Sequence, residues 1–102
     1  MNSHAILDEM IRLIKTTPLD DPSTMAGCYI KLQKLARDAI DQIKHEFDED
    51  DLDIPYIEEK IARCVSHVEC AISRLEGDQR SPSDWFGDAK MALCLARGKL
   101  PN

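Results

Sequence analysis

The chain has 102 residues, of which 43% are hydrophobic and 31% are charged. This length indicates a single domain over residues 1–102, and the apolar share is sufficient for one hydrophobic core. The 19 acidic residues outnumber the 13 basic residues, so the formal net charge is −6. A protein that grips nucleic acid by its phosphates needs a basic surface, and this charge therefore argues against direct nucleic-acid binding.

The sequence shows neither a membrane span nor a signal peptide. No stretch approaches the roughly 18 consecutive apolar residues of a span, and Asp8 and Glu9 interrupt the first apolar run. We therefore expect a soluble, cytoplasmic protein that contacts no membrane. In a reducing cytosol, buried or free thiols are favoured over disulfides for the four cysteines, which are Cys28, Cys64, Cys70 and Cys94.

Two helical patterns occupy the first half of the chain. The first runs from His4 to Thr16, with Ser3 as the expected N-cap, and it ends before Pro18. The second opens at Asp21-Pro22, an N-cap followed by proline at the first helical position. Its apolar residues recur at helical spacing as far as Phe47, which corresponds to a helix of roughly 39 Å at 1.5 Å per residue.

Two further helical patterns fill the second half. The third opens at Asp53, carries apolar residues as far as Leu75, and reaches Gly77 as a natural C-terminal cap. The fourth opens at Ser81, which has capping-box spacing to Asp84, and it ends at Gly98 or Pro101. Because the connections are short, neighbouring helices should run antiparallel. We predict an all-α bundle of about four helices, in which the second and third form a long central hairpin.

The acidic residues are concentrated at one end of that hairpin. Residues 38–59 contain ten acids and one base, Lys44, for a local net charge of −9, whereas the rest of the chain carries +3. Asp53, Glu58 and Glu59 suit the start of the third helix. Glu46, Asp48 and Glu49 instead lie at a helix C-terminus, where the helix dipole disfavours anions. A solubilising acidic loop, a docking surface for a basic partner and a cation site are the three interpretations.

The candidate chemical motifs are incomplete. Asp48, Asp50 and Asp53 resemble part of a calcium loop but lack its glycine and its final glutamate. Cys64, His67 and Cys70 recur every third residue, yet a closed zinc site needs a fourth ligand, and a Cys70–His67 nucleophilic pair has no visible third group. We therefore expect no metal site, no cofactor and no catalytic residues, and we do not expect an enzyme.

Apolar residues outside the core-facing positions suggest self-association. Ile30 lies almost opposite the apolar side of the second helix, and Met91 and Leu95 lie off the core face of the fourth. A helix that is apolar nearly all round is buried on more than one side. Either the fourth helix is central to the bundle, or these residues form a homodimer interface.

The charge layout and the small size favour an interaction protein. We expect it to bind and occlude a basic, nucleic-acid-binding surface of a partner protein, in the manner of anti-CRISPR, anti-restriction or nuclease-immunity inhibitors. The alternative is a structural or regulatory homodimer without nucleic-acid mimicry. The predicted partner-binding residues are Asp38, Asp41, Glu46, Asp48, Glu49, Asp50 and Asp51, and the predicted self-association residues are Ile30, Met91 and Leu95.

Overall fold

The computed structural model describes residues 2–73 and 80–101. Within these ranges the chain forms four α-helices and no strand, so the predicted all-α bundle is confirmed. The helices are α1 (Ser3–Thr16), α2 (Pro22–Glu46), α3 (Ile54–Ser73) and α4 (Pro82–Gly98). Leu75 and Gly77, the predicted last core residue and C-terminal cap of the third helix, lie outside the described residues.

The helix starts follow local capping chemistry. The Asp21 side chain accepts a hydrogen bond from the Ser23 backbone N–H at 3.0 Å, and Ser81 and Asp84 form the predicted capping box. The prediction that Ser3 caps α1 is wrong. Asn2 is the cap, because its side-chain oxygen accepts from the Ala5 N–H at 2.8 Å, and Ser3 is the first helical residue.

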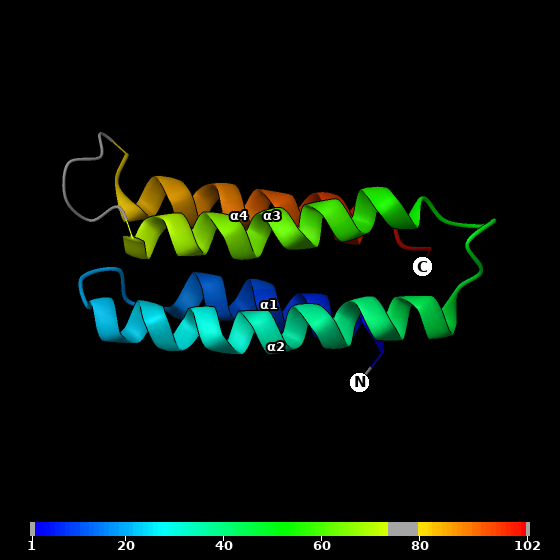
Figure 1. Ribbon diagram of the computed structural model, residues 1–102, viewed down its shortest axis with the longest axis horizontal. Helices are drawn as coiled ribbons and strands as arrows, with labels where there is room; N and C mark the ends of the chain where they lie inside the picture. Colours follow the sequence, from blue (N-terminus) through cyan, green and yellow to red (C-terminus); the bar gives the residue numbers. More distant parts are fainter. Residues whose placement is uncertain (1, 74–79, 102) are drawn as a thin grey trace.

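The four helices lie at the corners of a bundle 44 Å long. Sequence neighbours pack together, α1 also packs against α4, and α3 and α4 have the most extensive contact. Figure 1 shows α1 beside α2 and α4 beside α3, with the segment between α2 and α3 at the right-hand end. Across the described residues, α2 and α4 make no direct contact and are therefore diagonal to each other.

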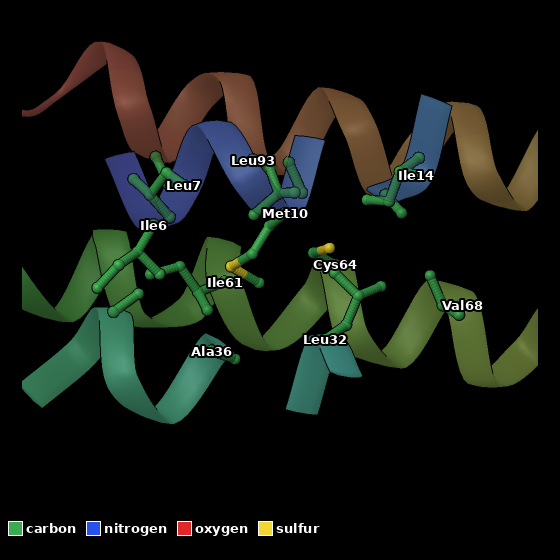
Figure 2. Packing of buried hydrophobic residues seen from close by; sticks show 14 of the residues in the cluster. Ile6, Leu7, Met10, Ile14, Leu32, Ala36, Ile61, Cys64, Val68 and Leu93 are labelled. Carbon is green, nitrogen blue, oxygen red and sulfur yellow. The ribbon is translucent and has the colours of Figure 1, made fainter. Parts of the chain in front are cut away.

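One continuous core lies between the two helix pairs. Figure 2 shows Leu7 and Met10 of α1, Leu32 of α2, Ile61 of α3 and Leu93 of α4 filling that space, and all five are fully buried. The buried face of α4 consists mainly of alanines, which allow a helix axis to approach its neighbour closely. The buried alanines of α4 are Ala89, Ala92 and Ala96. These small side chains account for the close packing of α4 on α3.

Ion pairs and cation–π contacts lie on the surface of the α3–α4 side. Arg63 is paired with Glu59 at 3.0 Å, and Arg80 is paired with Asp88. Lys60 and Lys99 both lie over the ring of Tyr56, at 5.2 and 5.4 Å from its centroid. A further ion pair, Arg97 to Asp8 at 2.5 Å, joins α4 to α1.

Candidate functional site

The acidic hairpin end comprises the seven predicted partner-binding residues, which lie on the C-terminal half of α2 and on the segment that joins α2 to α3. The joining segment is held in place by apolar side chains, because Leu52 and Ile54 are buried and Phe47 is half-buried. A backbone hydrogen bond from Asp51 N–H to the Asp48 carbonyl at 3.1 Å closes a turn between them. The acids of this segment therefore lie on a turn that is anchored to the bundle, in the connection between α2 and α3 (Figure 1).

Four consecutive carboxylates occupy this turn, at Asp48, Glu49, Asp50 and Asp51. All four residues are exposed. In the part of the chain that the structure describes, their side chains form no hydrogen bond and no ion pair. These four carboxylates therefore stabilise the fold through no direct bond to a described residue.

Glu46 has a different environment. Its carboxylate accepts hydrogen bonds from the Ser3 backbone N–H at 2.8 Å and from the Ser3 hydroxyl at 2.8 and 3.0 Å. Gln42 donates a weaker bond at 3.3 Å. The Ser3 hydrogen bonds, above all the backbone bond, lower the pKa of Glu46. Glu46 thus places an anion at the N-terminus of α1, where the helix dipole favours negative charge. This contact explains why an acid stands at the end of α2, and the sequence alone does not reveal it because the two residues are 43 positions apart.

Four of the seven acids line two separate surface hollows. Glu49 and Asp50 line one of about 480 Å³ together with the Lys44–Glu58 ion pair, whose atoms are 3.0 Å apart. Asp38 and Asp41 line another of about 340 Å³ between α1 and α2. Asp38 and Asp41 therefore extend the acidic surface along α2 rather than joining the turn.

The cysteines and the histidine of the incomplete motifs lie in different environments. Cys64 is fully buried, and burial raises its pKa to about 12, which suits a core thiol. The His67 ring packs on Trp85 with centroids 5.7 Å apart. All four cysteines are free thiols. Among the described residues, no three His, Cys, Asp or Glu side chains come together in a way that could hold a metal ion.

The predicted self-association residues are exposed but lie on separate faces. Ile30 on α2 is 66% exposed, and Met91 and Leu95 on α4 are 61% and 43% exposed. Since α2 and α4 are diagonal, these residues do not form one patch. Met91 and Leu95 instead line an α3–α4 groove of about 190 Å³, which also contains charged side chains from Lys60, Arg63 and Asp88.

Sequence reasoning missed a second groove, between α2 and α3. It has a volume of about 300 Å³, and its floor and walls are mostly aliphatic. The lining residues are Gln33, Ala36, Arg37, Ile40, Ile61, Ala62 and Val65. The apolar residues Ile40 and Val65 were the available signal in the sequence. Placing them in one groove requires knowing which face of α2 packs against α3.

Comparison with protein-family models, with curated proteins and with solved structures finds no match to this chain. In the described ranges, no helix combines the length and the apolar character that a membrane crossing needs.

Proposed function

We propose that the acidic hairpin end binds a basic surface of a partner protein and occludes it from nucleic acid. The observation that supports this proposal is the run of four exposed carboxylates, Asp48 to Asp51, which no described contact neutralises. Placing four like charges side by side is electrostatically unfavourable unless a cation or a cationic partner offsets the repulsion. A partner that normally holds phosphates offers the complementary charge.

The anchoring of the turn suits a binding role. Because Leu52 and Ile54 fix the turn to the bundle, the carboxylates lose little conformational freedom on binding. Lys44 is paired with Glu58, so its charge is shared between that partner and Glu49 and does not neutralise the four carboxylates of the turn. Asp38 and Asp41 extend the negative field along α2, which would steer a basic partner toward the end of the bundle.

The first experiment is a tagged pull-down from host lysate, washed at low and at high salt, with mass spectrometry of the retained proteins. We expect a basic, nucleic-acid-binding protein that is lost at high salt, because its association depends on charge. Adding duplex DNA or RNA should release the same protein. Recovery of this chain only with itself would instead favour the homodimer without nucleic-acid mimicry.

The second experiment reverses the charge of the turn. The triple substitution Asp48→Lys, Asp50→Lys and Asp51→Lys should weaken partner binding by on the order of 100-fold, since each reversal places like charges across the interface. The fold should remain intact because these side chains are exposed and unbonded in the described structure. Unchanged partner affinity in the folded variant would refute the proposal.

A homodimer is the second candidate function. It is favoured by Ile30, whose side chain is apolar and 66% exposed on the surface of α2. Burial of such a side chain contributes about 1.5–3 kcal/mol where a complementary surface covers it. The two functions are compatible, because Ile30 is not part of the acidic hairpin end.

A further inference from the structure

The α2–α3 face combines a protruding apolar side chain with an apolar groove. Gln33 and Arg37 of α2 line the groove, and Ile30 lies three and seven residues before them. Residues at these spacings share one helix face, so Ile30 stands on the same side of the bundle as the groove. The α2 residues of the groove run from Gln33 to Ile40, so its centre lies near Ala36, about 9 Å along α2 from Ile30 at 1.5 Å per residue.

We propose that a second copy of this chain covers the α2–α3 face, with Ile30 of each copy inserted into the groove of the other. A two-fold axis that crosses α2 at right angles, level with Gln33, exchanges the position of Ile30 with that of the groove. The contact is therefore self-complementary, as a two-fold dimer requires. This inference is independent of the proposed partner binding.

The charges on this face fit the same arrangement. Arg37 stands at the edge of the groove and forms no ion pair with any described residue. The two-fold axis brings it level with Tyr29 of the other copy, which lies beyond the groove and donates a hydrogen bond to Glu69 Oε2 at 2.9 Å. Arg37 of one copy therefore approaches the carboxylate of Glu69 in the other. Lys44 and Glu58, which also border this face, form an ion pair with each other.

The acidic hairpin ends decide between the two possible two-fold arrangements. An axis parallel to the helices would place both acidic ends side by side, and the repulsion would oppose association. The perpendicular axis places them at opposite ends of a dimer built from bundles 44 Å long, far beyond the screening length of about 8 Å at physiological salt. Both acidic ends then stay exposed, so each dimer presents two of them.

The α3–α4 groove is a poorer interface for a second copy. Met91 and Leu95 are exposed there, but Lys60, Arg63 and Asp88 line the same, smaller groove of about 190 Å³. Covering it would remove charged groups from water, and interface centres are depleted of such groups. The α2–α3 groove is larger, at about 300 Å³, and Arg37 is its one charged lining residue.

The test compares Ile30→Asp with Met91→Asp by sedimentation velocity of the full chain over a concentration series, in reducing buffer. The two side chains are similarly exposed, at 66% and 61%, so the substitutions are matched and both proteins should fold. We expect the unmodified protein and Met91→Asp to be dimers of equal affinity. Ile30→Asp should raise the dimer dissociation constant by at least about tenfold, as expected for a central interface residue.

Three results would overturn this interface. They are a monomeric unmodified protein, a dimer that Ile30→Asp leaves unchanged, and a dimer that Met91→Asp weakens equally. A charge swap tests the register: Arg37→Glu should weaken the dimer, and adding Glu69→Arg should restore much of the loss. If Ile30→Asp is a monomer that still binds the basic partner, the dimer interface and the acidic site are separate, and each proposal can fail without the other.

Discussion

The acidic hairpin end and the α3–α4 side carry charge in opposite ways. On the α3–α4 side, Arg63 is paired with Glu59, and Arg80 with Asp88. On the turn from Asp48 to Asp51, no described contact pairs the carboxylates. Paired surface charges are explained by the fold itself, whereas a run of unpaired like charges costs energy and gains nothing locally. This difference is the basis for proposing the turn as a binding surface.

Glu46 sharpens this comparison because it is an acid of the hairpin end that does have a structural partner. Ser3 is fully buried, and Glu46 accepts both its N–H and its hydroxyl. Glu46→Ala should lower the free energy of unfolding by about 1–3 kcal/mol, since it leaves buried donors without an acceptor. Urea denaturation followed by circular dichroism would measure the change.

Glu49→Ala is the matched control for that substitution. Glu49 is exposed and bonds to no described side chain, so its removal should change stability by less than about 0.5 kcal/mol. Equal losses in the two variants would contradict the role of Glu46 as the hydrogen-bond acceptor of Ser3 at the start of α1.

A pH series tests the same bond through protonation. The Ser3 hydrogen bonds hold the pKa of Glu46 below its ordinary value of 4.5. The carboxylate therefore adds stability at pH values above 4.5, and this stability is lost as the pH falls through the lowered pKa. We expect the stability difference between the unmodified protein and Glu46→Gln to be constant near neutral pH and to shrink in acid. A difference that does not depend on pH would exclude this role.

The smallest expected effect concerns the paired side. Glu59→Gln removes the partner of Arg63 in an ion pair whose side chains are 53% and 58% exposed. Exposed pairs of this kind contribute about 0.3–0.5 kcal/mol, so the unfolding free energy should barely change, and partner affinity should stay the same. A loss of partner binding in Glu59→Gln would show that the binding surface extends beyond the hairpin end.

Local patterns in the sequence predicted the elements of the fold. Apolar spacing, the Asp21-Pro22 start and the Ser81–Asp84 capping box are signals that depend on residues within a turn or two of each other. They therefore predicted the starts of the four helices, and the ends of the first, second and fourth, to within a residue or two. The exception is Ser3, a residue type that often caps helices. It is instead the first residue of α1 and donates hydrogen bonds to Glu46, 43 positions away.

The arrangement of surfaces could not be predicted in the same way. Both Ile30 and Met91 are exposed as expected, but whether they share a face depends on which helices are diagonal, and helical spacing does not encode that. The α2–α3 groove likewise arises from side chains of two helices that meet only in the folded bundle. The acidic run was visible directly, because it is continuous in the chain.

The most direct test of the central claim is the affinity of the captured partner for Asp50→Lys and for Asp20→Lys. Both residues are exposed, and the turns that carry them lie at opposite ends of the bundle (Figure 1). The two variants have the same net charge, so only the position of the change differs. We predict that Asp50→Lys weakens binding by at least about tenfold at low salt and that Asp20→Lys does not. Equal effects of the two substitutions would mean that the partner responds to overall charge, and binding by the acidic hairpin end would be contradicted.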